Sequence, residues 1–356
     1  MGLRGVTPSR MRVQDMPYVS SRSSRAAAVI LASFVLLLVS CSKQVHTPVH
    51  IPRGEVIAFA SYQLGGGYDP QTPPGGIYVM REDGSGAVHV HDLLGCPSWS
   101  PDASGIVFGQ PGDGPPNEVW VVNSDGTGLR RLGAGSHPAW SPDGTKIAFA
   151  YYSQNLSVHL PRPEGIYVMS PEGAEVRLLV SSLANNAGLG EPGWSPDGTR
   201  LAFPAQVSDG AASWALFVAR ADGAGFREIP HTRGVMVGSP AWSPDGTRIV
   251  FARARKLPLP VYGGGVIDGD FPGDPYVVHV EGAGFSHPTP FGSIDTWANP
   301  SWSPDGTKIA FDRNDRTWVV QADGTGVTRL AGAEEGPYSD KVDFCPAWSP
   351  APILDS

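Results

Sequence analysis

A Trp-Ser-Pro triplet recurs six times along the chain and constrains the fold more than any other feature of the sequence. The triplets begin at Trp99, Trp140, Trp194, Trp242, Trp302 and Trp348. Asp-Gly usually follows, and Ser-Pro-Asp-Gly is typical of a type I turn, because Pro presets φ, Asp bonds its own backbone and Gly takes the closing position. Such repetition indicates a chain built from one supersecondary unit.

Each unit also contains short apolar strands between turns. The triplet is followed by runs such as Ile-Val-Phe at 106–108, and a third strand such as Ile-Tyr-Val-Met at 77–80 leads into an acidic-Gly turn. A fourth strand is clearest at 129–132 and 327–330. This pattern predicts four-stranded antiparallel sheets. Because one such sheet cannot bury both of its faces, the copies must stack around an axis.

The two ends of the repeat region predict how the ring closes. The first copy, at Ile57-Ala58-Phe59, has no Trp strand before it, whereas Trp348-Ser349-Pro350 has almost no chain after it. We therefore predict an all-β fold: a six-bladed β-propeller of four-stranded antiparallel blades, closed by pairing of the C-terminal strand with the N-terminal blade. This closure hides strand edges that otherwise invite aggregation.

These residues resemble the WD-like (WSPDG) repeat of the TolB family, the periplasmic propellers of the Tol-Pal system. The resemblance covers roughly residues 54–350 and implies the propeller fold, but one fold hosts many activities. TolB proteins also carry an α/β domain before the propeller. Only residues 42–53 are available for it here, so we expect a TolB-like lipoprotein that lacks this domain.

The N-terminus has the pattern of an export signal. An Arg-bearing stretch is followed by the uncharged apolar run Ala26–Val39, which is shorter than the roughly 20 residues that span a bilayer. Leu38-Val39-Ser40-Cys41 resembles the lipobox of bacterial lipoproteins, which implies that Cys41 is lipidated. An ordinary signal peptide, or an uncleaved anchor with an incidental cysteine, is the alternative.

These features predict the division of the chain and its location. We expect a lipoprotein signal peptide at 1–40, a linker at 41–53, the propeller at 54–350 and a tail at 351–356. Ser42 follows the cysteine, and we expect the protein in the cell envelope, either on the periplasmic side of the outer membrane or at the cell surface.

Charge limits the partners that the protein can bind. The formal net charge is −8, and residues 1–40 contribute five Arg against one Asp, which leaves −12 for the remainder. A surface this acidic repels phosphate backbones, so nucleic acid is excluded as a partner. We expect a monomer that touches the membrane only through its lipid anchor.

The predicted blade places its loops on two different faces. With the Trp strand innermost, the Ser-Pro-Asp-Gly turns lie on one face, and the longer, varied loops at 61–76, 150–165 and 252–275 lie on the other. Binding usually resides where variable loops sit on a rigid frame. The candidate binding residues around the channel mouth are His137, Asn185, Glu191, Arg233, Asp295, Trp297, Asp340 and Lys341. We expect this face to engage a protein, a peptide or a glycan.

Two cysteines occupy equivalent positions. Each inner strand begins with a residue followed by Pro, and this residue is Cys96 in one copy and Cys345 in another. The closure argument makes their blades neighbours, and an oxidising compartment permits a disulfide between them. Two buried thiols are the alternative, which the expected spacing of adjacent inner strands favours, because a disulfide requires a Cα separation of roughly 5.5 Å.

The sequence contains few signals for catalysis. No Gly-x-Ser-x-Gly elbow occurs, and His89-Val90-His91-Asp92 fits surface histidines of an outer strand better than a metal site. We therefore predict a binding or scaffold module with no catalytic residues, metal or cofactor. The alternatives are an enzyme working in the channel, such as a polysaccharide lyase or hydrolase, and a passive structural lipoprotein.

Overall fold

The computed structural model describes residues 48–63, 75–110, 117–152, 163–181, 189–207, 213–234, 236–254, 256–260, 266–270, 274–288, 299–313, 316–330, 341–350 and 352–353. These residues all belong to one compact unit, Val45–Ser356. The predicted signal peptide and Cys41 lie outside them. Among the described residues, no helix is long and apolar enough to cross a membrane.

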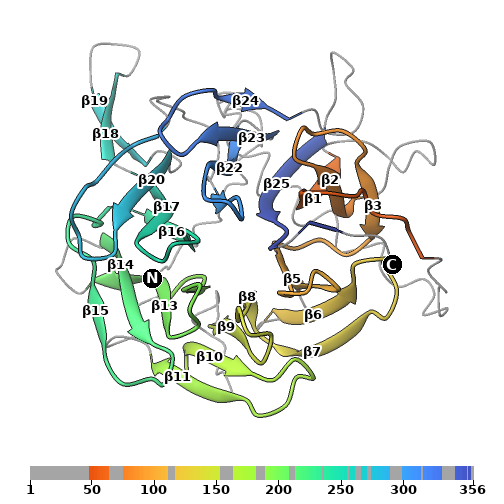
Figure 1. Cartoon of the computed structure of the whole chain (residues 1–356). Coiled ribbons are helices and arrows are strands. Elements are labelled where there is room, and N and C mark those ends of the chain that lie inside the picture. Colours follow the sequence, from red (N-terminus) through yellow and green to blue (C-terminus); the bar gives the residue numbers. More distant parts are fainter. Residues whose placement is uncertain are drawn as a thin grey trace, which may run out of the picture. The chain divides into compact units, whose positions relative to one another are not determined.

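Six antiparallel sheets are arranged around a central axis, so the described chain is a six-bladed β-propeller (Figure 1). The strands, from the axis outward, are as follows: blade 1, β25 (Lys341–Trp348), β1 (Val56–Gln63), β2 (Gly76–Arg81) and β3 (Val88–His91); blade 2, β4 (Pro97–Trp99), β5 (Gly105–Gln110), β6 (Glu118–Asn123) and β7 (Arg130–Ala134); blade 3, β8 (Ser136–Trp140), β9 (Ile147–Tyr151), β10 (Gly165–Met169) and β11 (Arg177–Ser181); blade 4, β12 (Gly193–Trp194), β13 (Arg200–Val207), β14 (Ser213–Arg220) and β15 (Phe226–Glu228); blade 5, β16 (Met236–Trp242), β17 (Arg248–Ala254) and β20 (Asp274–His279); blade 6, β21 (Ser301–Trp302), β22 (Lys308–Arg313), β23 (Arg316–Gln321) and β24 (Thr328–Arg329).

The ring closes as predicted. The C-terminal strand β25 pairs antiparallel with β1, with Ile57 opposite Trp348 and Gln63 opposite Lys341. Blade 1 therefore combines one strand from the end of the chain with three strands from its beginning. Beyond this pairing, an isolated bridge joins Gly54 to Ile353.

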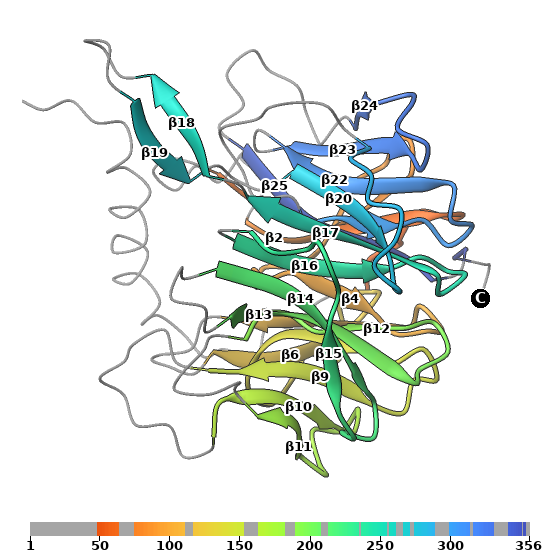
Figure 2. The same cartoon turned by 90° about the vertical axis from the view of Figure 1, so that its left-hand side faces the viewer.

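Blade 5 departs from the predicted four-stranded pattern. Its sheet has three strands, and the fourth position is reduced to a single bridge between Val277 and Ser286. The segment 252–275, predicted as a long loop, contains a separate hairpin of β18 (Lys256–Pro260) and β19 (Val266–Asp270). Figure 2 shows this hairpin standing away from the stacked blades.

The Ser-Pro-Asp-Gly segments form the predicted turns. In blade 3, the Gly144 N–H donates to the Ser141 carbonyl at 2.9 Å, and Gly144 has a φ of +71°. This left-handed conformation suits glycine because a Cβ is unfavourable there. Asp143 accepts a hydrogen bond of 2.6 Å from the Ser141 hydroxyl and one of 3.0 Å from the Thr145 N–H. These bonds lower the pKa of Asp143 to about 2.

The hydrophobic core lies between neighbouring blades. The second strand of every blade contributes a fully buried Phe, at 59, 108, 149, 203, 251 and 311. The repeated Trp also links blades through its indole: the Nε1 of Trp99 donates to the Ala347 carbonyl at 3.1 Å. Trp194 and Trp242 make the same contact with the blade before each of them. The repeated residues are therefore used for stacking the blades.

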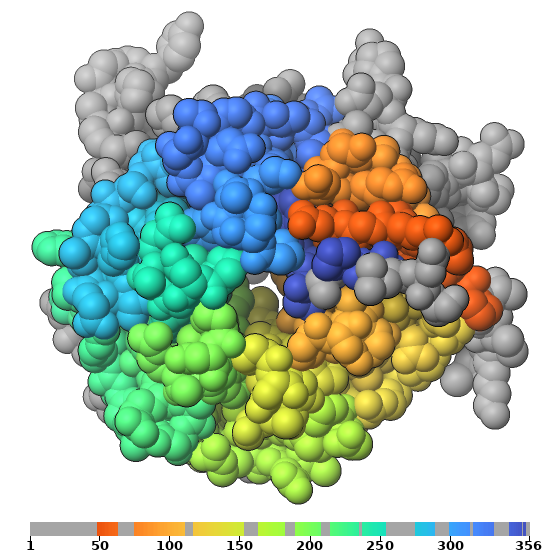
Figure 3. Space-filling view, viewed as in Figure 1, coloured from red at the N-terminus to blue at the C-terminus, as the bar shows by residue number. Residues whose placement is uncertain are grey.

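The strand pairings also fix which loops share a face. Gln63, at the end of β1, lies opposite Lys341 at the start of β25, and Tyr151 lies opposite Gly165 in blade 3. Each inner strand therefore starts on the face that holds the connections after the second strands, as predicted. The space-filling view shows an opening at the centre of the ring (Figure 3).

Candidate functional site

Six equivalent residues surround one end of the central channel, and together they are called the mouth ring here. Each directly precedes the Pro of an inner strand. In blade order they are Cys345, Cys96, His137, Glu191, Ser239 and Asn299. A cavity of about 320 Å³ is lined by the mouth ring, by the prolines and small residues that follow it, and by four of the repeated Trp side chains.

The inner strands alternate between two backbone forms. In blades 1, 3 and 5 the mouth-ring residue is left-handed, with φ of +55° at Cys345, +50° at His137 and +49° at Ser239. The register shifts at each of these places, as at a β-bulge. The inner strands of blades 2, 4 and 6 begin at or after the Pro and carry no such shift. Positive φ in residues other than glycine is uncommon and clusters at functional sites.

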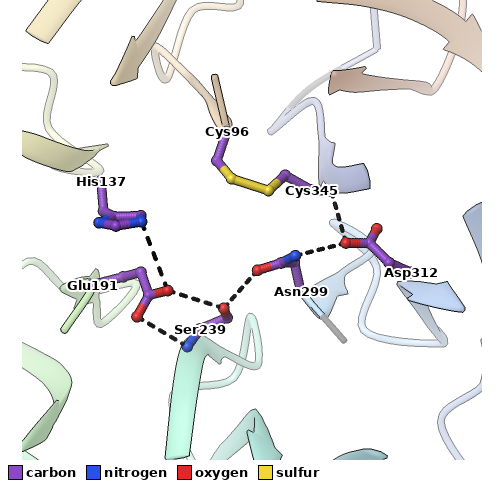
Figure 4. The surroundings of a disulfide bond; sticks show 7 residues. All are labelled: Cys96, His137, Glu191, Ser239, Asn299, Asp312 and Cys345. Atoms are coloured by element: carbon purple, nitrogen blue, oxygen red, sulfur yellow. Dashed lines mark hydrogen bonds and ion pairs between the residues drawn. A yellow bond between two sulfur atoms is a disulfide. The ribbon is translucent and has the colours of Figure 1, made fainter. Parts of the chain in front are cut away.

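Hydrogen bonds connect the mouth ring from blade to blade (Figure 4). The Ser239 hydroxyl lies 3.3 Å from Glu191 Oε1 and 2.7 Å from Asn299 Oδ1. The Ser239 N–H also points to Glu191 Oε2, at 3.4 Å. On the other side of Glu191, His137 Nε2 lies 3.9 Å from Oε1. Four consecutive blades thus contribute one polar side chain each to a continuous arc.

Asp312, on β22, connects this arc to the closing strand. Its Oδ2 accepts a bond of 2.6 Å from Asn299 Nδ2 and one of 2.9 Å from the Cys345 N–H. Asp312 is 4% exposed, and its Oδ1 has no hydrogen-bond partner within the described part of the chain. Burial raises the pKa of Asp312 to about 8 in spite of these two bonds, and the nearby Asp343 also raises it. Asp312 is therefore a buried carboxyl group with a raised pKa, and it contacts both the polar arc, at Asn299, and the closing strand, at Cys345.

The arc ends at a disulfide between Cys96 and Cys345, whose Cα atoms are 5.1 Å apart. The bond joins β25 of blade 1 to the residue directly before β4 of blade 2 and spans 249 residues of sequence. Of the two alternatives for this cysteine pair, the structure contains the disulfide. Figure 4 shows it beside the polar arc.

His137 marks the other end of the arc. Its ring stacks on Tyr152, with centroids 6.4 Å apart and planes inclined by 8°. Nδ1 is buried and has no hydrogen-bond partner among the described residues, so the imidazole is positioned by stacking and by its approach to Glu191. Since His137 contacts Glu191 and not Ser239, the order of groups differs from a serine triad, in which the imidazole lies against the hydroxyl.

The structure brings together only part of the predicted binding set. His137 and Glu191 line the cavity. Arg233 does not: it lies between β15 and β16, and its Nε donates to the Glu228 carboxylate at 2.8 Å. Lys341 is the first residue of β25. The predicted residues Asn185, Asp295, Trp297 and Asp340 lie outside the described residues. Among the described residues, no three His, Cys, Asp or Glu side chains converge as metal ligands.

Three functional candidates were missed by sequence reasoning, although each carries a signal. Ser239 and Asn299 occupy the same pre-proline position as His137 and Glu191. Asp312 follows the repeated Phe of blade 6. The other five copies have Ala, Gly or Pro at that point, namely Ala60, Gly109, Ala150, Pro204 and Ala252. A charged residue at a position that is otherwise small or apolar is the signal that identifies Asp312.

Comparison with known proteins supports the fold and leaves the activity open. No protein-family model matches the sequence. TolB from Acinetobacter baumannii has a similar structure, with a TM-score of 0.59 and 17% identity over 83% of this chain and 66% of that one. At this identity the likeness shows the fold alone.

Two curated proteins match the sequence over shorter stretches. An uncharacterised protein of Agrobacterium fabrum is 30% identical over 113 residues, or 30% of this chain and 38% of that protein. The uncharacterised peptidase YuxL of Bacillus subtilis is 24% identical over 196 residues, or 46% of this chain and 29% of YuxL. The chain thus matches about a third of the length of these relatives.

Proposed function

We propose that the protein is an envelope-anchored binding or scaffold module that engages a protein, peptide or glycan through its loop-rich face, with the mouth ring as the centre of the contact. One observation carries the proposal. The Pro and Trp of the inner strand are the same in all six copies, whereas the residue before Pro is Cys in two neighbouring blades and His, Glu, Ser or Asn in the other four. A position that the repeat does not need for stacking is free to serve recognition.

The chemistry of the cavity also supports binding. Small-molecule sites are mostly apolar and contain a few polar groups that fix orientation. Here the prolines and tryptophans supply apolar surface, and His137, Glu191, Ser239 and Asn299 supply donors and acceptors. The volume of about 320 Å³ is at the small end of the roughly 300–1,000 Å³ usual for such sites. It suits a single side chain or sugar unit of a larger partner.

The proposed location follows from the lipobox-like motif at Cys41 and from the disulfide. Disulfides persist in oxidising compartments, so the Cys96–Cys345 bond supports a site outside the cytoplasm. Metabolic labelling with a fatty acid analogue tests the anchor. Label should appear on the wild-type protein and be lost from Cys41→Ser; label that persists in the variant contradicts the proposal.

The binding role is tested with a variant of the mouth ring. His137→Asn and Ser239→Gly are combined, since Asn and Gly tolerate the left-handed backbone of these two positions. Binding of the full-length protein to panels of envelope peptides and oligosaccharides is measured by calorimetry. We expect binding by the wild type and at least tenfold weaker binding by the variant, with unchanged thermal unfolding.

The same samples decide between binding and catalysis. The control variant is Asp197→Asn, in the turn at the opposite end of an inner strand, and it should bind like the wild type. His137 and Glu191 are a possible base and acid pair, so each oligosaccharide is also examined for cleavage. Turnover that Glu191→Ala abolishes would establish the channel enzyme instead, and binding that is indifferent to the mouth-ring variant would remove the proposed site.

A further inference from the structure

We infer that the mouth ring recognises a primary ammonium group, held against the Glu191 carboxylate with the Ser239 hydroxyl beside it. This inference rests on the proposed binding function and names the chemical group that the site selects. The hydrogen-bond donors and acceptors of the polar arc support it, because they leave Glu191 without a short hydrogen bond.

Asp312 and Asn299 form the buried end of the arc. Asn299 turns its NH₂ group to Asp312, at 2.6 Å, so its carbonyl oxygen faces Ser239. The Ser239 hydroxyl lies 2.7 Å from that oxygen. A hydroxyl has a single proton, and the shorter contact takes it. The more distant Glu191 Oε1, at 3.3 Å, therefore receives no proton from Ser239.

Glu191 is consequently a carboxylate with unused acceptor capacity. Its remaining contacts are long: 3.4 Å to the Ser239 N–H and 3.9 Å to His137 Nε2. Well-formed hydrogen bonds from N–H donors to carboxylates are about 2.7–2.9 Å when the donor is charged. The side chain is 30% exposed and lines the cavity. It is therefore open to a donor that comes from outside the protein.

The electrostatics of the cavity specify the charge of that donor. Among the described residues that line the cavity, Glu191 is the only acidic one, and none is Lys or Arg. The next carboxylate along the arc is Asp312, behind Asn299. The basic side chain nearest to Glu191 is His137, whose Nε2 lies 3.9 Å from Oε1 and makes no short hydrogen bond to it. A positively charged ligand group that approaches more closely therefore gains a favourable interaction that a neutral group does not.

The geometry favours an ammonium group as the source of this charge. An ammonium has three donors and no acceptor, and the cavity offers it the Glu191 oxygens and the second lone pair of Ser239. The cavity is small, at about 320 Å³, so a compact group fits better than a branched one. An amino sugar and a lysine side chain both present this chemistry.

Matched probes test the inference on the full-length wild-type protein without any substitution. Glucosamine is compared with N-acetylglucosamine, and a lysine tripeptide with its Nε-acetylated form, because acetylation removes the charge. Binding is measured by calorimetry or by NMR titration. We expect at least one ammonium probe to bind tenfold or more tightly than its acetylated counterpart, and the pair that responds identifies the source of the group.

Substitution then locates the contact. Glu191→Gln keeps the shape of the side chain and removes its charge. It should weaken the binding of the ammonium probe that the wild type prefers by at least tenfold. Glu281→Gln is the matched control, since Glu281 is 81% exposed and pairs with Arg227 on the surface. Its binding should match the wild type.

The outcomes separate this inference from the proposed function. Equal binding of both members of each pair, or equal binding by Glu191→Gln, overturns the ammonium site. If larger peptides or oligosaccharides still bind and the mouth-ring variant abolishes that binding, the proposed function stands without it. If no ligand binds in a manner sensitive to the mouth ring, both fail.

Discussion

The two ends of the inner strands differ although the same short segment builds both. At the turn end, the Ser-Pro-Asp-Gly sequence recurs in blades 3 to 6, and the hydrogen bonds of its Asp stay within the turn. At the mouth end the residues differ, and their hydrogen bonds run from one blade to the next. Repetition therefore serves the fold, and divergence creates one asymmetric site.

The pKa values of two aspartates, one at each end of the inner strands, are shifted in opposite directions. Asp143, in a turn, is exposed and accepts bonds from Ser141 and Thr145, which lower its pKa to about 2. Asp312, behind the mouth ring, is buried, and desolvation raises its pKa to about 8. The first favours the folded state when ionised, and the second favours it when protonated.

The largest effect on stability is expected from the disulfide. Its two cysteines lie at the mouth end of the inner strands, yet we expect them to stabilise the fold, so they test whether the mouth end serves recognition alone. Replacing both Cys96 and Cys345 by Ser removes a crosslink that spans 249 residues. We expect the free energy of unfolding to fall by about 3–5 kcal/mol. Chemical denaturation measures it, and the wild type under reducing conditions serves as the comparison. A loss well below this range would show that pairing of β25 with β1 closes the ring unaided.

A smaller effect is expected from Asp312→Asn. The folded pKa of Asp312 is raised from about 4 to about 8, so its contribution to stability is complete below pH 4 and is lost as the pH rises toward 8. An amide at this position accepts the same two hydrogen bonds without a charge. We expect the variant to be more stable than the wild type by about 1–3 kcal/mol at pH 8.

The test of Asp312 is the difference between the two proteins along the pH scale. Stability measured by denaturation from pH 4 to 8 should decline more steeply for the wild type than for Asp312→Asn. If the unfolding free energies of the two proteins changed in parallel with pH, the raised pKa of Asp312 would be contradicted.

A turn aspartate should show the opposite pH dependence and a smaller effect. Asp143→Ala removes the acceptor for Ser141 and Thr145, and we expect a loss of about 1 kcal/mol at pH 7. Because the pKa is lowered to about 2, the contribution exists above pH 4 and disappears as the pH falls through 2. Asp143→Asn, which retains one acceptor, should lose less. Neither variant should alter ligand binding.

The smallest effect on stability is expected at the mouth ring. Glu191→Gln and His137→Asn should each change the unfolding free energy by less than about 0.5 kcal/mol, since these side chains are partly exposed and make long contacts. Thermal unfolding provides the measurement. A substantial loss in either variant would assign the mouth ring a structural role and weaken the case for recognition there.

Much of the fold is readable from the sequence because each repeat carries its own turn chemistry. The blade number, the pairing of β25 with β1 and the assignment of faces all follow from the Trp-Ser-Pro copies. The hairpin of β18 and β19 could not be predicted from these copies. Its first strand contains Pro258 and Pro260, and proline removes the N–H that ladder pairing needs, so such a run argues against a strand.

The candidate site is less readable, since it depends on contacts between copies. The sequence predicts that His137 and Glu191 lie at the channel mouth, but it does not reveal that Ser239 bridges Glu191 and Asn299. Arg233 was placed at the mouth because it precedes an inner strand, yet it bonds Glu228 away from the cavity. Position in the repeat predicts which face a residue occupies; side-chain direction decides whether it reaches the axis.

Because bulged and unbulged inner strands alternate, the structural repeat of this propeller is a pair of blades and not a single blade. Removing or duplicating a single blade would place two inner strands of the same kind next to each other, either both bulged with a left-handed residue or both without one. Removing or duplicating two consecutive blades together keeps the alternation. Chimaeras of this protein should therefore exchange blades in consecutive pairs.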